Sequence, residues 1–452
     1  MEYVIGLDLG TTGLKAVLFD GTGEVIKTSS RPAALSTPAP GEAEQNPEAW
    51  YEWSCDLLRE VTEDIDRSAV RGVGLSSQGI SFVPVDQDNR PLRAALSWLD
   101  MRAEAETKEL GRLMPEDEWF RRTGKPLRAA YTLPKLLWMR KHEPEIFQNA
   151  DAFLMPMDYF LARATGNRCT DPTMAGGTML FDLETRAWSP EIAAMTGMDI
   201  RKLPAVLPTG SQAGILNTET QRRTGLSPIP AAVGAQDQKI AAYGANLRYG
   251  EATLSLGTAG ATEVLSHVRG GDLPTFLYAD GEQYCFEGCV DTAGAAIRWA
   301  KDILLPGGSY DEWNALASEG KPGCAGVRFI PRLADGGGWE NLTLAAARGD
   351  LARAVYEGIA REVHALLSRS VSAGAEISAL RVFGGGAQSE LLCEILASAC
   401  AVPVKALLFP EMAALGAAKS AAKCAGMDIS RFGENQPVRE YGGKYILDFR
   451  RK

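Results

Sequence analysis

A short glycine-threonine turn is written twice in this chain of 452 residues, once in each half. LDLGTTG runs from Leu7 to Gly13, and LSLGTAG runs from Leu254 to Gly260. Apolar runs of strand character flank both copies, a pattern typical of a β-hairpin. The repetition predicts a duplicated fold with two similar α/β halves, residues 1–245 and 246–452.

Each copy is followed by segments with clear local signals. Asn46 and Pro47 predict the cap and first residue of a helix, and Ser389 predicts the cap of another. The remaining expected elements are a three-stranded antiparallel meander over residues 1–30, a buried strand over 70–78, mainly helical structure over 116–224, a second hairpin over 251–265, a long helix over 350–371 and a strand with a glycine-rich turn over 380–388.

Composition limits the classes of function. The net charge of −10 argues against general binding to nucleic acid or to an anionic membrane surface. The start of the chain lacks the features of a signal peptide, and no apolar run is long enough to span a bilayer. Eight cysteines without zinc-type spacing indicate free thiols, and a cytoplasmic location is expected. The three histidines lie in no catalytic or metal-binding pattern, so carboxylates, lysines and backbone N–H groups are the expected chemical groups.

The first turn has the chemistry of a phosphate and metal site. Gly10 allows consecutive N–H groups to point outward, and Thr11 and Thr12 add hydroxyl groups. Asp8 ends the preceding strand, where a carboxylate can hold Mg²⁺, and Lys15 adds positive charge. An ordinary hairpin turn explains the same residues, but the second copy favours phosphate binding.

The second turn is expected to bracket the same phosphates with Gly257 and Thr258. Ser255 stands where the first copy has Asp8. One metal-anchoring acid is enough for one site, so the replacement fits a shared nucleotide. Drift of a duplicated scaffold explains it equally well.

A glycine-rich stretch, FGGGAQS, joins a strand to a helix. Gly385, Gly386 and Ala387 permit close approach of an adenine or a ribose, and Ser389 ends the stretch. A tight strand-to-helix connection is the alternative. Neither a Rossmann fingerprint nor a Walker A loop is present in the sequence.

Asp237 follows a strand and opens a helix in the sequence VGAQDQK. Aspartate is a preferred N-cap, so the position has a structural explanation. A carboxylate held at that place is also a candidate general base toward a substrate hydroxyl. Gln238 adds a donor for a hydroxyl-rich substrate.

A second polar set precedes the helical middle of the chain. Gln78, Trp98, Asp100 and Arg102 suit a sugar, because they combine an aromatic face with paired polar groups. The alternation of the last three predicts an extended segment that sends their side chains to one side. An edge strand with an internal ion pair is nearly as good an explanation.

Together these motifs resemble the FGGY carbohydrate kinases, from about residue 3 to about residue 425. The resemblance is carried, in the order typical of that family, by DLGTTGLK, WLDMR, KLLW at 135–138, GAQDQ, LGTAG, DLARAVYEG and GGGAQS. It implies an α/β, two-lobed actin-like ATPase (ribonuclease H-like) fold whose duplicated domains close on ATP in a central cleft.

The resemblance also implies roles for individual residues. Asp237 would be the base, Asp8 the Mg²⁺-associated acid, and Tyr131 a further residue of the sugar pocket. Phosphate contacts would come from Thr11, Thr12, Gly257 and Thr258, adenosine contacts from Gly385, Gly386 and Ala387, and sugar contacts from Gln78, Trp98 and Asp100.

Within the family the chain is most similar to the xylulokinase branch. That branch usually has Met-His directly after the glutamine, whereas this chain has Gly79 and Ile80 after Gln78. Xylulose, another ketose, a tetrulose or a polyol therefore stay open as acceptors. The alternatives in function are an actin-like ATPase switch and a non-catalytic sugar sensor. Homodimers are frequent among relatives, which leaves a homodimer open.

Overall fold

The structure, a computed structural model, describes residues 1–447. The chain divides into two units, each built from several segments. Unit 1 comprises residues 1–244, 274–283 and 413–435. Unit 2 comprises residues 245–273 and 284–412 and the chain from 436 onward.

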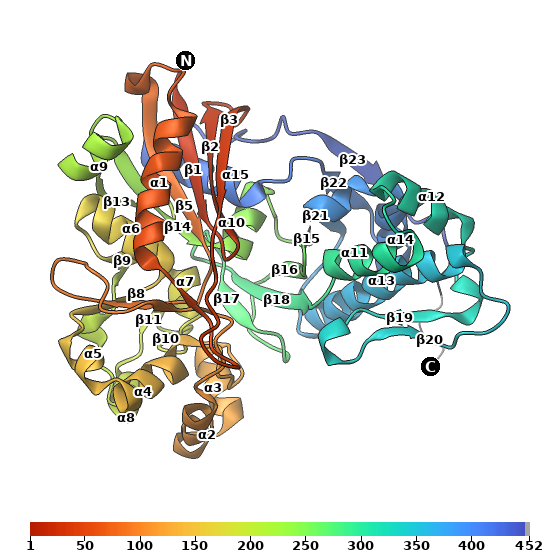
Figure 1. Cartoon of the computed structure of the whole chain (residues 1–452), viewed down its shortest axis with the longest axis horizontal. Helices are drawn as coiled ribbons and strands as arrows, with labels where there is room; N and C mark the ends of the chain where they lie inside the picture. The colour runs from red at the N-terminus through yellow and green to blue at the C-terminus, as the bar shows by residue number, and fades with distance from the viewer. Residues whose placement is uncertain (448–452) are drawn as a thin grey trace. The chain divides into compact units, whose positions relative to one another are not determined.

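Unit 1 is organised around a six-stranded sheet with the order β13-β14-β5-β1-β2-β3 (Figure 1). The first three strands of the chain form the predicted antiparallel meander. β1, β5 and β14 run parallel to one another, and β13 runs antiparallel at one edge. The strands are β1 (Tyr3–Leu9), β2 (Gly13–Asp20), β3 (Val25–Pro32), β5 (Val70–Ser77), β13 (Gln212–Ile215) and β14 (Pro230–Gln236).

The helices of unit 1 include the expected one at Pro47, and the Asn46 side chain caps it by accepting the Glu48 N–H. The middle of the chain is mainly helical, as the sequence predicts. The helices are α1 (Pro47–Val61), α2 (Glu104–Leu113), α3 (Glu116–Thr123), α4 (Thr132–His142), α5 (Pro144–Asn149), α6 (Pro156–Thr165), α7 (Pro172–Gly176), α8 (Pro190–Thr196), α9 (Thr218–Thr224), α10 (Asp237–Gly244) and α15 (Met412–Cys424, in unit 1 from Ala413).

Helices cover both faces of this sheet. α1 and α6 lie on the face where alternate residues of β1, such as Ile5 and Leu7, join a buried apolar cluster (Figure 1). The side-chain position of Gly6 is on the other face of the sheet. A Cβ there would lie 1.9 Å from the carbonyl oxygen of Ala414 in α15. Gly74 of β5 has the same relation to Ala417. The backbone of α15 therefore rests directly on the strands.

Short two-stranded sheets fasten the loops of unit 1. Their strands are β4 (Glu44–Gln45) with β7 (Ala95–Leu96), β6 (Val83–Val85) with β8 (Ala152–Leu154), β9 (Cys169–Thr170) with β12 (Ala205–Val206), and β10 (Phe181–Asp182) with β11 (Ala187–Trp188); β17 (Thr275–Leu277) lies in the segment 274–283.

Unit 2 contains a second sheet, in which its strands follow the order β18-β16-β15-β21-β22-β23. The predicted hairpin, long helix and glycine-rich turn are all present. The elements are β15 (Glu251–Leu256), β16 (Gly260–Ser266), β18 (Tyr284–Val290), α11 (Gly294–Leu304), α12 (Tyr310–Glu319), β19 (Arg328–Ile330), β20 (Gly338–Glu340), α13 (Arg348–Ser372), β21 (Ala379–Phe383), α14 (Glu390–Cys400), β22 (Val404–Leu407) and β23 (Val438–Tyr441).

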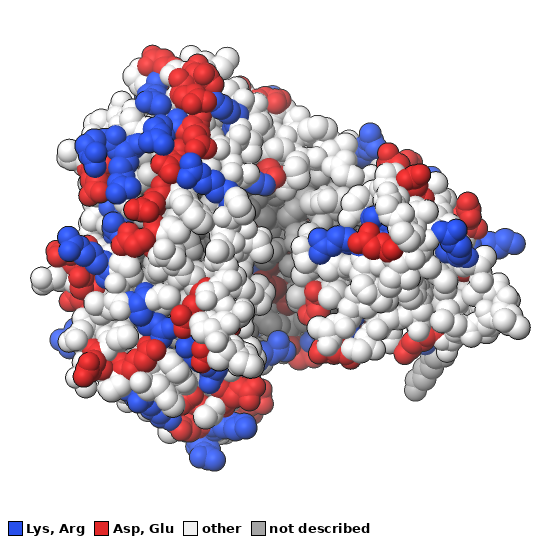
Figure 2. All heavy atoms as spheres, in the orientation of Figure 1, with Lys and Arg blue, Asp and Glu red and all other residues white. Residues whose placement is uncertain are grey.

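The surface carries both signs of charge. On the face that Figure 2 shows, Lys and Arg side chains are interspersed with Asp and Glu. The eight cysteines all lie within residues 1–447, and no disulfide joins them there. No helix among residues 1–447 combines the length and apolarity needed to cross a bilayer.

A buried acid in α6 gives the fold a pH dependence. Asp158 is fully buried, and its carboxylate accepts the N–H of Met155 at 2.9 Å. Burial raises the pKa of Asp158 from 3.8 to about 8. Between these values the native carboxyl keeps a proton that the unfolded chain releases, so this group makes the protein less stable as pH rises.

Asp158→Asn removes this titration and keeps an acceptor for the Met155 N–H. We expect the stability of the variant, relative to wild type, to rise by about 1.4 kcal/mol per pH unit between pH 4 and 8 and then level off. Thermal unfolding of both proteins across that range measures it, with the exposed Asp88→Asn as control. A difference in Tm that is constant with pH would contradict a protonated Asp158.

Candidate functional site

The carboxyl ends of three neighbouring parallel strands bring polar residues to one edge of the unit 1 sheet. Asp8 of β1 lies beside Ser76 of β5, and Ser76 lies beside Ala235 of β14. The Ser76 hydroxyl donates to Asp8 Oδ1 at 2.6 Å. Asp237 follows β14 directly as the first residue of α10, as predicted, and is half-buried. Crevices at the carboxyl ends of parallel strands are where α/β folds place ligands.

The first glycine-threonine turn joins β1 to β2 above this edge. Gly10 has no room for a side chain, because a Cβ would lie 2.8 Å from the carbonyl oxygen of Gly13. Thr12 is exposed at the tip, and Thr11 and Lys15 are half-buried. In the hairpin register Lys15 stands opposite Asp8. The turn therefore gathers its backbone N–H groups and one lysine next to the acid.

A network of neutral hydrogen bonds holds Gln78 beside the turn. The side chain is only 1% exposed. Its Oε1 accepts from Thr11 Oγ1 at 3.3 Å and from Ser81 Oγ at 3.1 Å, and its Nε2 donates to Gln45 Oε1 at 2.8 Å. Gln78 is thus fixed in one orientation by three partners.

Trp98 is bonded to the same turn. Its indole Nε1 donates to Thr11 Oγ1 at 2.8 Å, and its backbone N–H donates to Ser81 Oγ at 2.9 Å. The side chain is 39% exposed, so one apolar surface of the ring stays open. Such a surface can accept the apolar face of a sugar ring or chain.

The prediction of an extended segment from Trp98 to Arg102 is wrong. The chain turns here, with the Asp100 N–H donating to the Ser97 carbonyl at 3.1 Å. Asp100 is fully buried and faces away from the exposed Trp98, because its carboxylate accepts from the Ala43 N–H at 2.7 Å and from Arg102 Nε at 2.9 Å. Charge pairing in the interior has overridden strand alternation.

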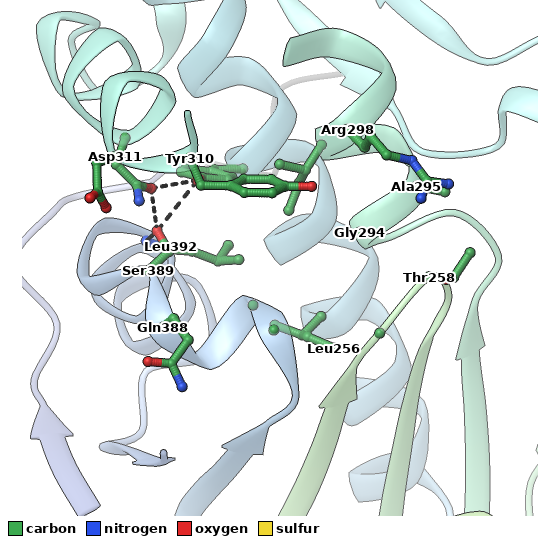
Figure 3. Close-up of a pocket in the computed structure, with 16 residues that line it drawn as sticks. Leu256, Thr258, Gly294, Ala295, Arg298, Tyr310, Asp311, Gln388, Ser389 and Leu392 are labelled. Atoms are coloured by element: carbon green, nitrogen blue, oxygen red, sulfur yellow. Dashed lines mark hydrogen bonds between the residues drawn. The ribbon is translucent and has the colours of Figure 1, made fainter. Parts of the chain in front are cut away.

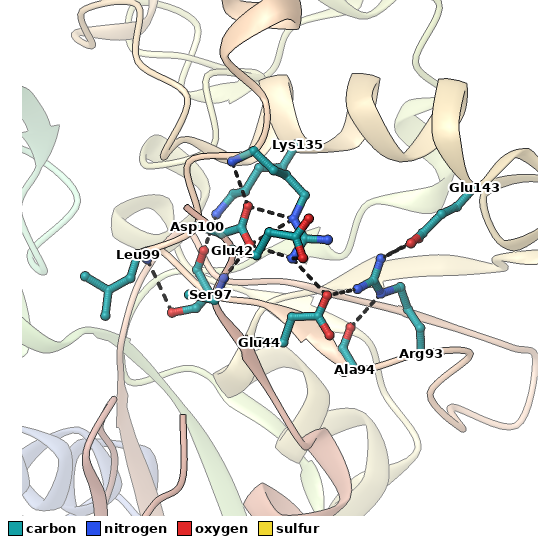
Figure 4. A network of polar contacts seen from close by, with 11 residues as sticks. Glu42, Glu44, Arg93, Ala94, Ser97, Leu99, Asp100, Lys135 and Glu143 are labelled. Carbon is teal, nitrogen blue, oxygen red and sulfur yellow. Dashed lines mark hydrogen bonds and ion pairs between the residues drawn. The ribbon is translucent and has the colours of Figure 1, made fainter. Parts of the chain in front are cut away.

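Asp100 and Arg102 belong to a buried ion network (Figure 4). Arg102 also bonds Glu44 at 2.9 Å, and Arg93 joins Glu44 to Glu143. Truncating one partner of such a buried network leaves an uncompensated charge and is strongly destabilising. The network fixes the loop that carries Trp98.

Lys135 is another buried charged residue close to Asp100. The sequence motifs did not mark it as a site residue, although it begins the KLLW stretch. It is fully buried, and its Nζ donates to the carbonyl oxygens of Ile80 at 3.1 Å and Ser97 at 2.7 Å. Burial lowers the pKa of Lys135 to about 7. It ties the Gln78 loop to the Trp98 loop.

Asp171 and Thr173 were also missed, although Asp171 followed by Pro172 is the same helix-start signal as Asn46 followed by Pro47. Asp171 is fully buried, caps α7 and accepts from Thr173 Oγ1 at 2.9 Å. Burial raises the pKa of Asp171 to about 6. The Gln236 N–H donates to Thr173 Oγ1 at 2.8 Å. This chain of bonds fixes the end of β14 just before Asp237.

The last two residues predicted for the sugar site are Tyr131 and Gln238, and their surroundings differ. Tyr131 is the N-cap residue of α4 and is 9% exposed, within an apolar cluster around Trp119. Gln238 follows Asp237 in α10 and is half-buried, and its N–H donates to Asp237 Oδ1 at 2.8 Å.

The second turn, in unit 2, is packed against the start of α11. The N–H groups of Gly294 and Ala295 donate to the carbonyls of Gly257 and Thr258 at 2.9 and 3.0 Å. A Cβ on Gly294 would lie 2.4 Å from the Gly257 oxygen, so the close approach depends on glycine. Ser255 occupies the Asp8 position and pairs with Phe383 of β21.

A cavity of about 390 Å³ lies beside this turn within unit 2 (Figure 3). It unites the two predicted nucleotide stretches and adds residues from α11 and α12. The lining residues are Leu256, Gly257, Thr258, Gly294, Ala295, Ile297, Arg298, Tyr310, Asp311, Asn314, Tyr356, Gly385, Gly386, Gln388, Ser389 and Leu392.

The glycines of FGGGAQS have distinct local reasons. Gly384 adopts φ +86°, which favours glycine, and a Cβ on Gly386 would lie 2.7 Å from Leu256. A Cβ on Gly385 would meet nothing within 4 Å, so this residue leaves space. Ala387 is 1% exposed, belongs to the apolar core of unit 2 and is not among the residues that line the cavity.

One end of the cavity is polar. Tyr356 Oη and Ser389 Oγ donate to Asn314 Oδ1 at 2.6 and 2.7 Å, and the Ser389 hydroxyl also caps α14 as predicted (Figure 3). Burial raises the pKa of Tyr356 to about 12, so it stays a donor at neutral pH. The sequence offered no signal for Asn314, Tyr310 or Arg298, because they reach the cavity only through the placement of α11 and α12.

Residues 1–447 contain no group of three or more His, Cys, Asp or Glu side chains that could hold a metal by themselves. A metal at Asp8 would therefore need further ligands of another kind, such as waters or the phosphates of a bound molecule.

Comparison with known proteins agrees with this arrangement. The N-terminal domain of the FGGY family of carbohydrate kinases matches residues 3–244, and its C-terminal domain matches residues 257–425. A xylulose kinase of Staphylococcus epidermidis is 29% identical, covering 93% of this chain and 88% of that protein. A glycerol kinase of Gloeobacter violaceus is 31% identical, covering 92% and 87%.

The fold is shared as well. The crystal structure of xylulose kinase from Rhodospirillum rubrum superposes with a TM-score of 0.91 at 28% identity, covering 99% of this chain and 95% of that one. The predicted actin-like α/β fold with two domains is confirmed. The chain is a sugar kinase and belongs to the FGGY family of carbohydrate kinases.

Proposed function

We propose that this kinase transfers the γ-phosphoryl group of Mg·ATP to a terminal hydroxyl of a ketose, with D-xylulose as the first candidate. The observation that carries the proposal is the placement of Asp8 and Asp237 at the carboxyl ends of β1 and β14, the two strands on either side of β5. Relatives named xylulose kinase support the ketose. The relative named glycerol kinase keeps a polyol as the second candidate.

Asp237 is proposed as the general base. Its carboxylate accepts the proton of the acceptor hydroxyl as that oxygen approaches the γ-phosphorus in line. Its backbone is held on one side by the bond from Gln236 to Thr173 and on the other by the start of α10. A base held this firmly loses little freedom when the substrate binds.

Asp8 is proposed to associate with Mg²⁺. Magnesium is usually bound by one or two carboxylates, waters and substrate phosphates, so one acid at a strand end fits its donor preference. The Ser76 bond to Oδ1 orients the carboxylate. When bound, the ion neutralises charge on the phosphoryl group being transferred.

The two turns are proposed to contact phosphate oxygens. Gly10, Thr11, Thr12 and Lys15 offer N–H groups and charge in unit 1. The Thr11 hydroxyl is already bonded to Trp98 and Gln78, so its contribution is the backbone N–H. Gly257 and Thr258, in unit 2, present the second turn at the rim of the cavity.

The cavity in unit 2 is proposed to hold adenosine. Its volume is in the range of small-ligand sites, roughly 300–1,000 Å³. Gly385 leaves room for a flat base, Gly386 lets the turn pack against Leu256, and Leu256, Tyr310 and Leu392 supply apolar walls. Ser389 acts through Asn314, which it orients, and Ala387 contributes through the packing of the apolar core.

The sugar is proposed to contact the open ring surface of Trp98, with Tyr131 and Gln238 as further residues of the sugar site. Gln78, which is 1% exposed, holds the Thr11 hydroxyl that bonds Trp98. Asp100 and Arg102 are too buried to touch a substrate and instead hold the turn that carries Trp98. The family membership favours this reading over an ATPase switch or a non-catalytic sensor.

Asp237→Asn removes the base and keeps its size. We expect turnover to fall by roughly two to four powers of ten, because general-base help is lost, while the Kd for ATP stays within about threefold. Steady-state kinetics and nucleotide calorimetry measure the two effects. Turnover close to wild type would remove Asp237 from this role.

Gly385→Leu fills the space that this glycine leaves in the cavity. We expect the KM for ATP to rise about tenfold or more, since each 1.4 kcal/mol of lost binding is a factor of ten, with a smaller effect on the KM for the sugar. Gly442→Leu is the matched control, because Gly442 is also uncrowded and has an ordinary φ. Equal effects on both substrates would speak against adenosine in this cavity.

The whole proposal is tested by ADP release with a panel of D-xylulose, other ketoses, a tetrulose and glycerol. Turnover that depends on one ketose is the expected outcome. Glycerol as the best acceptor would replace the ketose, and ADP release that no sugar increases would contradict the transfer reaction.

A further inference from the structure

Gln236, the last residue of β14, has a side-chain amide oxygen without a hydrogen-bond partner among residues 1–447. Its side chain is half-buried, yet this oxygen, Oε1, is buried. Buried side-chain oxygens nearly always have a partner in protein, water or ligand. An amide in this state, one residue before Asp237, indicates a place for a ligand.

The neighbouring loop is shaped to seat this side chain. A Cβ on Gly79 would lie 2.9 Å from Gln236 Cγ, and 3.8 Å from both Cδ and Nε2. Because Gly79 has no side chain, the side chain of Gln236 has room to lie beside it. In the sheet Gln236 pairs with Ser77, which places it directly beside the strand end that leads into Gln78 and Gly79.

The base of the side chain is also fixed. The Gln236 N–H donates to Thr173 Oγ1, and Thr173 is held by the buried Asp171. The backbone is thus held, while the terminal amide has a broad, roughly twofold torsion. Rotation about that bond can present either the oxygen or the NH₂ group to a ligand.

We propose that Gln236 is a substrate-binding residue that recognises the hydroxyl next to the one that is phosphorylated. This inference rests on the proposed function, since it takes Asp237 as the group that faces the acceptor hydroxyl. Gln236 ends β14 and Asp237 begins α10, so the two residues lie next to each other at the carboxyl edge of the sheet. An amide suits this task because a hydroxyl can donate to Oε1 and accept from Nε2.

The chemical class follows from this arrangement. The preferred acceptor carries a free hydroxyl, of one configuration, on the carbon adjacent to its terminal CH₂OH group. D-xylulose and L-ribulose form a suitable pair of probes, because they differ only in configuration at that carbon, C4. The enzyme is expected to discriminate between these two epimers through Gln236.

Gln236→Leu tests the inference, because leucine keeps Cβ and Cγ and loses the amide. The kcat/KM for D-xylulose is expected to fall about tenfold, the size of one lost hydrogen bond, and the ratio of kcat/KM between the epimers to fall similarly. The KM for ATP and the Tm should stay at wild-type values. Gln87→Leu, an exposed glutamine on another loop, is the matched control and should change none of these.

The outcomes distinguish a failure of the Gln236 role from a failure of the proposed function. A wild-type enzyme that works on D-xylulose and a variant with unchanged discrimination would overturn the role of Gln236 alone. A wild-type protein that turns over neither ketoses nor polyols would overturn the proposed function and this inference with it.

A second pair of variants tests whether Gln236 packs against Gly79. Gly79→Ala should lower Tm in the wild-type background, where the new methyl group meets Gln236 Cγ, and should be better tolerated together with Gln236→Ala. Equal losses in both backgrounds would show that the two residues do not pack as described and would remove the basis of the proposal.

Discussion

The parallel pairing of β1, β5 and β14 is the constraint on which the chemistry of unit 1 depends. In a parallel sheet the carboxyl ends of neighbouring strands meet at one edge, so residues far apart in sequence become neighbours there. Asp8 and Asp237 are separated by most of unit 1 along the chain, yet the register brings both to that edge through Ser76. A slip of one residue would turn either side chain to the other face.

Close packing of helices on the sheet keeps this register in place. Gly6 and Gly74 let the backbone of α15 approach β1 and β5, and Gly416 lets α15 approach α10, where a Cβ would lie 1.9 Å from the Ile240 oxygen. Because α10 begins at Asp237, the helix that carries the proposed base is packed against the helix that rests on the strands. Substituting any of these glycines would force backbone to move, which a packed interior resists.

Buried polar groups divide into two kinds in this protein. Asp100, Arg102 and Lys135 are saturated by partners and stabilise loops, although the residue types and spacing of Asp100 and Arg102 suggested direct contact with a sugar. Gln236 is the opposite case, because its amide oxygen has no partner among residues 1–447. Local sequence cannot separate the two kinds, since the difference lies in which distant groups reach each side chain.

The sequence alone determined the duplicated hairpins, the capped helices at Asn46 and Ser389 and the place of Asp237 between strand and helix, because these depend on residues close together in the chain. Only the tertiary structure decided that Trp98 stays exposed while Asp100 is buried, and that Asn314 joins the glycine-rich turn in one cavity. Those outcomes depend on long-range packing and charge pairing, and neither leaves a periodic signal in the local sequence.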